Sequence, residues 1–121
     1  ERFPSHRENA EGYILTAETM EWFGANYLES EADRDDWRAS PLRAASFENL
    51  PAAVVITAEF DPLRDEGAAY AKALADAGND VEHRMYEGMV HTFFQLGPLV
   101  PKGAEAVTQI ADVARRHLDP S

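Results

Sequence analysis

The first half of the chain contains one stretch in which apolar residues follow a helical period. Between residues 17 and 28, bulky apolar side chains recur every three or four positions: Met20, Phe23, Tyr27 and Leu28, with Trp22 beside them. This spacing predicts an amphipathic helix with an aromatic stripe, and Thr16 offers an oxygen to cap its N-terminus. Residues 1–16 show no helical or strand period, so we expect an extended or looping lead-in.

The pattern changes at Pro51. Residues 52–58 form a short apolar run with β-branched residues in its middle, which predicts a strand that is covered on both faces in a parallel sheet. Residues 63–77 predict a helix, residues 81–86 a second strand, and residues 102–118 a final helix. The second half of the chain is therefore expected to form a β-α-β-α unit of the α/β class.

Each of the two later helices carries an apolar stripe that we expect to face inward. In the first of them the stripe consists of Gly67, Tyr70, Ala71, Leu74 and Ala75. In the second it consists of Val107, Ile110, Ala111, Ala114 and Leu118. Such stripes are typical of helices packed against a core.

The predicted sheet has too few strands to be stable by itself. Parallel sheets are stable when several strands are covered on both faces, whereas this chain offers only two. The missing neighbour must come from a partner chain, from polypeptide upstream, or from an unusual use of residues 1–16.

Composition places the chain among globular proteins and narrows its partners. Hydrophobic residues make up 45% of its 121 positions and charged residues 27%. The net charge of −11 disfavours contact with phosphate backbones, and basic patches with interleaved aromatics are absent, so nucleic acid is not expected as a partner. No apolar run is long enough to span a bilayer and no signal peptide is visible, which makes the cytoplasm the expected location.

The motifs give no indication of a metal or cofactor site. The chain has no cysteine, no HExxH and no phosphate-binding glycine motif. His6, His83 and His117 lack partners at ligand spacing, and the acidic run at 33–36 lacks the glycine and terminal glutamate of an EF-hand loop. We therefore expect neither a metal nor a cofactor.

Two side chains capable of acid–base chemistry follow the predicted strands. Asp61 comes directly after the first strand and His91 follows the second. Ligands gather at the carboxyl ends of parallel strands, which lie about 4.8 Å apart, so the carboxylate and the imidazole can meet there. Such a carboxylate fixes the histidine tautomer and leaves the other nitrogen to act as a base. In the simpler alternatives, Asp61 caps the helix that follows its proline neighbour, and His91 is a surface residue of a glycine-flanked loop.

Two long motifs carry a resemblance to a known family. The segments TAEFDPLRDEG (57–67) and YEGMVHTFF (86–94) resemble the C-terminal part of the hormone-sensitive-lipase-like α/β-hydrolases, also called bacterial family IV esterases. Three further segments resemble the same family in the same order: SHRENAEGYILT (5–16), ETMEWFGANYL (18–28) and SPLRA (40–44). The resemblance implies the C-terminal portion of an α/β-hydrolase fold with an incomplete sheet. It also implies that Asp61 is the acid and His91 the general base of a Ser–Asp–His triad.

The nucleophile that the resemblance implies has no counterpart in the chain. The family places its serine in a G-x-S-x-G turn and its oxyanion hole in an HGGG-type segment, both upstream of the acid. None of the serines lies between glycines in this way: Ser5, Ser30, Ser40, Ser46 and Ser121. No HGG run occurs either. The chain alone is therefore expected to be inactive on esters.

The resemblance also divides the chain in two. Residues 1–50 resemble a cap-like helical segment and connector, and residues 51–121 the C-terminal βαβα part of the hydrolase core. Aromatic side chains in both parts are candidates for lining an acyl pocket: Trp22, Phe23, Phe93 and Phe94. Ordinary packing against the core is the simpler interpretation of each. Thr92 occupies a position where glycine is expected.

Two functions from different classes follow from these observations. In the first, the chain is part of a serine carboxylic-ester hydrolase that acts on small acyl esters. The missing N-terminal part of the same enzyme, or another chain, then completes its sheet. In the second, the chain is a truncated, non-catalytic module that assembles through its open sheet edge. Dimers of the resembling family often form around the last strand, so a homodimer through residues 81–86 is a further expectation.

Overall fold

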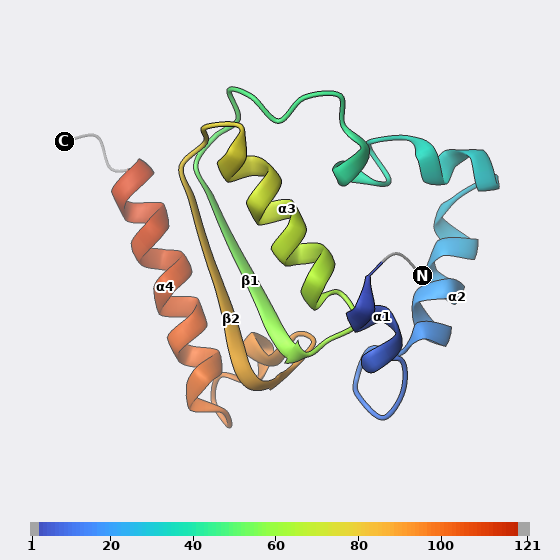
Figure 1. The fold of residues 1–121 in the computed structure, drawn as a ribbon. Helices are drawn as coiled ribbons and strands as arrows, with labels where there is room; N and C mark the ends of the chain where they lie inside the picture. The colour runs from blue at the N-terminus through green and yellow to red at the C-terminus, as the bar shows by residue number, and fades with distance from the viewer. Residues whose placement is uncertain (1–2, 119–121) are drawn as a thin grey trace.

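The computed structural model describes residues 3–118, and the two halves of the chain differ in secondary structure (Figure 1). The N-terminal half consists of helices and 3₁₀ turns: α1 (Pro4–Glu8), α2 (Ala17–Tyr27), η1 (Glu31–Asp35) and η2 (Pro41–Arg43). The C-terminal half alternates strands and helices: β1 (Ala53–Phe60), α3 (Arg64–Asp76), β2 (Val81–Val90), η3 (Phe93–Leu96) and α4 (Pro101–Leu118). The predicted β-α-β-α order and the α/β fold class are confirmed.

The sheet consists of β1 and β2 in parallel, with α3 and α4 on opposite sides of the pair (Figure 1). Thr57 of β1 faces α3, where a Cβ added to Gly67 would lie only 2.7 Å from the Thr57 Cγ2. Ala58, the next residue, points to the other face because side chains alternate along a strand. There it belongs to a buried cluster with Tyr86 of β2 and Ala106 of α4.

The buried core on the α4 side is small and aromatic. The ring centroids of Tyr86 and Phe93 lie 5.0 Å apart, and both side chains are almost fully buried. The Tyr86 hydroxyl donates a hydrogen bond to Gln109 Oε1 at 3.0 Å, which satisfies the one polar atom of the ring. This cluster attaches η3 and α4 to the strand that leads to the candidate base.

The N-terminal half confirms one prediction and corrects another. Thr16 caps α2 as predicted, because its Oγ1 accepts a hydrogen bond from the Thr19 N–H at 3.1 Å. The expectation of an irregular lead-in is wrong over α1, which begins at a proline that suits the first helical position. The backbone N–H of Ser5 and its hydroxyl group both bond to the segment that follows β1, so tertiary contacts hold a helix too short to be stable alone.

The predicted inner faces of the helices are confirmed only in part. On α3, Ala71 and Leu74 are buried as expected, whereas Ala75 is exposed. On α4 the predicted stripe is wrong, since Ile110 is 40% and Leu118 79% exposed. The buried residues of α4 are instead Gly103, Ala106 and Val113. A sheet of two strands is too narrow to cover the whole apolar face of an 18-residue helix.

Helix α2 departs further from expectation. It lies apart from the sheet, beyond α1 (Figure 1), and none of its residues is buried. Trp22 is 61% and Phe23 56% exposed. The interpretation of this aromatic stripe as ordinary core packing is therefore wrong for these residues.

Within residues 3–118, none of the helices combines the length and hydrophobicity required to cross a membrane.

Candidate active site

Asp61 and His91 meet at the carboxyl ends of the two strands. Asp61 directly follows β1 and His91 directly follows β2. His91 Nδ1 lies 2.8 Å from Asp61 Oδ2, a short distance typical of a charge-assisted hydrogen bond. Asp61 is 7% exposed, so the contact lies largely out of water. The structure thus brings together the two side chains that the strand ends single out.

An irregularity in the sheet sets this juxtaposition. Ala58 pairs with Tyr86, and the next register pair is Phe60 with Val90. Between these pairs β1 has the single residue 59, whereas β2 has residues 87, 88 and 89. Gly88 adopts a φ of +74° within this longer stretch, and its N–H donates to the Glu59 carboxylate at 2.7 Å. The bulge places the residue after β2 beside the residue after β1.

The Asp61 carboxylate is oriented by two donors, one on each oxygen. Oδ1 accepts from the Leu63 N–H at 2.8 Å, while Oδ2 faces His91. The alternative in which Asp61 caps the following helix is corrected here. Helix α3 begins at Arg64 and its N-cap residue is Leu63, so Asp61 instead forms a local turn that precedes the helix.

His91 presents its other ring nitrogen away from the carboxylate. A carboxylate oxygen accepts only, so Nδ1 must carry the proton of this hydrogen bond and Nε2 keeps its lone pair in the neutral ring. The His91 side chain is 32% exposed, and within residues 3–118 its Nε2 has no hydrogen-bond partner. This arrangement leaves a nitrogen that can accept a proton from a neighbouring group.

The backbone conformation at Thr92 explains why glycine is expected after His91. Thr92 has a φ of +61° and a ψ of 16°, the left-handed conformation that is rare for a β-branched residue. The Thr92 Oγ1 donates to the His91 carbonyl at 2.7 Å and compensates part of this strain. The loop therefore keeps the turn that glycine would adopt freely.

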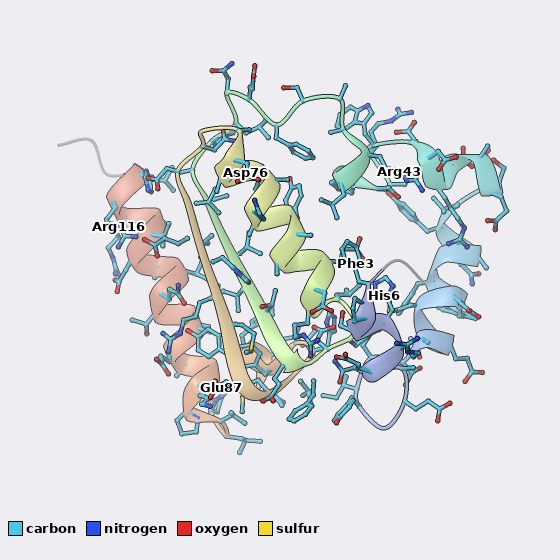
Figure 2. All side chains as sticks on the ribbon, viewed as in Figure 1. Phe3, His6, Arg43, Asp76, Glu87 and Arg116 are labelled. Carbon is cyan, nitrogen blue, oxygen red and sulfur yellow. The ribbon has the colours of Figure 1, made fainter. Side chains whose placement is uncertain are left out.

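Two cavities adjoin the acid side of the site. The larger, of about 610 Å³, is lined by Phe3, His6 and Arg43, which Figure 2 labels, and by Phe23 and Tyr27 of α2. The smaller, of about 330 Å³, includes Asp61 itself together with Ile56 and Tyr70. Leu42, Leu63 and Glu66 line both, so the two cavities share a wall.

The aromatic candidates for an acyl pocket separate into distinct environments. Phe23 lines the larger cavity, whereas Trp22 packs edge-on against Phe23 and does not line it. Phe93 is buried in the core beside Tyr86, which confirms the simpler packing interpretation for this residue. Phe94 is 44% exposed. Of the four, Phe23 is the one that lines either of the two cavities.

The N-terminal segment contributes contacts that the sequence patterns did not reveal. Ser5 and Asn9 are polar yet 0% and 4% exposed, and both bond to the segment around Asp61. Their position in an apparently irregular lead-in concealed them, because no period marks such residues. Across residues 3–118, no group of three or more His, Cys, Asp or Glu side chains is arranged to hold a metal ion.

Charge pairing stabilises the start of α3. Asp65 and Glu8 both bond to the Arg64 guanidinium, at 2.8 and 2.7 Å, and raise the pKa of Arg64. In turn the hydrogen bond from Arg64 lowers the pKa of Asp65, although partial burial opposes this shift. These pairs join α1 to the helix that follows the candidate acid.

Comparisons with known proteins bear on the whole constellation. The α/β-hydrolase fold family matches residues 1–95 of the chain. The chain belongs to this family. Among curated relatives of this α/β-hydrolase, an ethyl acetate hydrolase of Pseudomonas putida is 37% identical over 117 residues, covering 97% of this chain and 37% of the relative. The carboxylic ester hydrolase LipN of Mycobacterium tuberculosis is 41% identical, covering 88% of this chain and 29% of the relative.

Solved structures show the same relationship in three dimensions. The thermophilic carboxylesterase EstE1, cloned from a metagenomic library, matches with a TM-score of 0.93 and 41% identity, covering 98% of this α/β-hydrolase chain and 40% of that one. A hyperthermophilic esterase of Pyrobaculum calidifontis matches with a TM-score of 0.87 and 43% identity, covering 91% and 36%. The predicted resemblance to esterases of the α/β-hydrolase fold is confirmed. The chain spans between 29% and 37% of the length of the two curated relatives named above.

Proposed function

We propose that this chain supplies the acid and the general base of a serine carboxylic-ester hydrolase of the hormone-sensitive-lipase-like type. The nucleophilic serine lies on polypeptide outside residues 1–121. The observation that carries the proposal is the 2.8 Å contact between His91 Nδ1 and Asp61 Oδ2 at the carboxyl ends of the strands. Membership of the α/β-hydrolase family and the names of its ester-hydrolysing relatives support the choice of reaction.

The proposed reaction uses each atom of the pair. His91 Nε2 removes the hydroxyl proton of the serine while the serine oxygen attacks the ester carbonyl. Asp61 holds the ring through Nδ1–H and stabilises the imidazolium that forms. The imidazolium gives its proton to the leaving alcohol, and an acyl-enzyme remains. A water molecule, deprotonated by the same nitrogen, then attacks the acyl carbon. The bond to the serine oxygen breaks, the imidazolium returns its proton to that oxygen, and the carboxylic acid leaves.

The chain alone is proposed to be inactive. No G-x-S-x-G turn or HGGG-type segment occurs in its 121 residues, so neither the nucleophile nor the usual oxyanion donors are supplied. The expected substrates of the complete enzyme are small acyl esters, and the proposed location is the cytoplasm.

A division of labour within the chain is part of the proposal. Residues 51–121 form the catalytic part of the core and residues 1–50 a cap-like segment over the acyl pocket. The cavity of about 610 Å³ between α2, η2 and α3 supports this role, because Phe23 and Tyr27 give it an apolar wall. Its shared wall with the cavity at Asp61 joins the proposed pocket to the proposed chemistry.

A second candidate function rests on the narrow sheet. A sheet of two strands leaves a strand edge that can pair with another chain, and residues 81–86 of β2 lie along such an edge. In this alternative the chain is a non-catalytic module that assembles through β2, as a homodimer or on a different partner. Native mass spectrometry distinguishes the two, because a stable monomer contradicts assembly through the edge.

The experiment that tests the proposed function restores the absent polypeptide. Residues 1–121 replace the matching portion of the Pseudomonas putida ethyl acetate hydrolase, and hydrolysis of a chromogenic short-chain ester is measured. His91→Ala is expected to lower kcat on the order of 10³-fold or more. His117→Ala, which removes an exposed histidine paired with Asp80 on the far side of the chain, is the matched control and should leave kcat unchanged. An active chimera in which His91→Ala matches His117→Ala would contradict the proposal.

A further inference from the structure

The short helix α1 binds the segment that carries the proposed acid. β1 ends at Phe60 and α3 begins at Arg64, so residues 61–63 belong to neither a strand nor a helix. Backbone in such a gap belongs to no helix or strand ladder, and a turn bond from the Arg64 N–H to the Asp61 carbonyl spans it at 3.1 Å. Two buried polar side chains, Ser5 within α1 and Asn9 directly after it, bond to this gap and its borders.

Asn9 donates hydrogen bonds to the backbone on both sides of Phe60. Its Nδ2 donates to the Glu59 carbonyl at 3.3 Å and to the Asp61 carbonyl at 3.2 Å. The amide must present its nitrogen here, because a reversed amide would set its oxygen against two acceptors. Glu59 is the one β1 residue opposite the bulge of β2, so Asn9 secures the backbone where the strand register is interrupted.

Ser5 secures the other end of the gap. Its Oγ donates to the Pro62 carbonyl at 2.7 Å and accepts from the Asp65 N–H at 3.2 Å. The Ser5 N–H in turn donates to Asp65 Oδ2 at 2.9 Å. The backbone on both sides of Asp61 is thus bonded by Ser5 of α1 and by Asn9, which directly follows that helix.

We propose that Asn9, assisted by Ser5, is a positioning residue that holds the Asp61 carboxylate within hydrogen-bond reach of His91 Nδ1. This inference rests on the proposed function, since it explains how the proposed acid is aimed. The Asp61 carbonyl accepts from Asn9 Nδ2 and from the Arg64 N–H, and Asn9 is the donor from outside this segment. The carboxylate then has one oxygen on the Leu63 N–H and the other on the histidine. A shift of about 1 Å at such a pair is enough to lower a catalytic rate on the order of 100-fold.

The alternative is that Asn9 merely attaches the N-terminal segment to the fold. A structural role of that kind lowers thermal stability without altering the imidazole. The tautomer of His91 separates the two, because the Asp61 hydrogen bond alone holds the proton on Nδ1. Long-range ¹⁵N–¹H correlation spectra of the labelled 121-residue chain report that tautomer directly.

The experiment compares Asn9→Ala with Arg7→Ala, each well below its own Tm. Arg7 is an exposed residue of α1, the helix that Asn9 follows, and serves as the control. Wild type and Arg7→Ala are expected to show a single tautomer with the proton on Nδ1, and Asn9→Ala a mixture with the proton on either nitrogen. In the chimera described above, Asn9→Ala is expected to lower kcat about 10- to 100-fold with KM unchanged.

A folded Asn9→Ala that keeps the wild-type tautomer overturns the inference. Where Asn9→Ala does not fold, Ser5→Ala decides, since it removes one hydroxyl and is expected to shift the tautomer in the same direction; a wild-type tautomer there is equally contradictory. The spectra do not depend on ester hydrolysis. If the chimera is inactive but Asn9→Ala changes the His91 tautomer, the proposed function alone is contradicted. If the chimera is active but Asn9→Ala leaves the tautomer unchanged, this inference alone is overturned.

Discussion

The carboxyl end of the sheet and the helices α2 and α4 differ in how far their side chains find partners within the chain. Around Asp61, each carboxylate oxygen has a donor, and the carbonyls of residues 61 and 62 accept hydrogen bonds from Asn9 and Ser5. In contrast, α2 has no buried residue, and α4 leaves Ile110 and Leu118 exposed. The difference teaches that contacts within this chain fix the Asp61–His91 pair, while the apolar faces of α2 and α4 are left uncovered.

The largest expected loss of stability arises at the carboxyl end of the sheet, near Asp61. Asp65→Asn removes the ion pair with Arg64 and weakens the bond from the Ser5 N–H, so we expect a loss of about 2 kcal/mol at pH 7. Arg64 lowers the pKa of Asp65 in the folded chain, so its stabilisation is complete above the unfolded value of about 4 and lost as the pH falls further.

The measurement is urea unfolding between about pH 7 and about pH 3. Wild type should lose stability over the acid part of this range more steeply than Asp65→Asn. Asp112→Asn, which removes an exposed pair on α4, is the control and should follow wild type. Equal pH slopes for Asp65→Asn and wild type would contradict the assignment.

Two glycines test the same contrast through packing. Gly67→Ala inserts a methyl group 2.7 Å from Thr57 Cγ2 and should destabilise the chain by about 1–2 kcal/mol, despite the better helix propensity of alanine. The nearest atom to a Cβ at Gly24, on the uncovered α2, is the end of the Arg34 side chain at 3.4 Å. Gly24→Ala should therefore stabilise by up to about 1 kcal/mol. If both substitutions changed the free energy of unfolding in the same direction, as measured by denaturant unfolding, the contrast between the two regions would be refuted.

Backbone strain beside His91 predicts a smaller effect. Asparagine tolerates the left-handed conformation better than threonine, so Thr92→Asn is expected to stabilise by about 0.5–1 kcal/mol. Asn49 has a similar φ of +57° in the exposed connector, and Asn49→Thr should cost about the same amount. Calorimetric Tm values that move in the opposite directions would contradict this account of the loop.

The smallest effect is expected on the uncovered face of α4. Ile110→Gln should change the stability of the isolated chain by less than about 0.5 kcal/mol, because the side chain is 40% exposed. In the chimera, where further polypeptide is present, the same substitution should lower the Tm clearly. No change in the chimera would show that this face remains uncovered there as well.

The sequence predicted what depends on period and on strand ends. Alternation of strand and helix, the Thr16 cap and the meeting of Asp61 with His91 all follow from local patterns. The bulge opposite Glu59 and the contacts of Asn9 did not, because they arise between segments 29 positions apart for the bulge and 50 or more apart for Asn9. The predicted buried stripe of α4 is wrong, because periodicity identifies an apolar face but does not show whether a sheet of two strands is wide enough to cover that face.

The most direct test of the central claim removes the acid without changing its shape. Asp61→Asn in the chimera keeps an oxygen for the Leu63 N–H but removes the charge that is proposed to stabilise the His91 imidazolium. The quantity to measure is kcat for a short acyl ester, and we predict a fall on the order of 10³- to 10⁴-fold with KM little changed. A kcat for Asp61→Asn that equals that of the unsubstituted chimera would contradict the account.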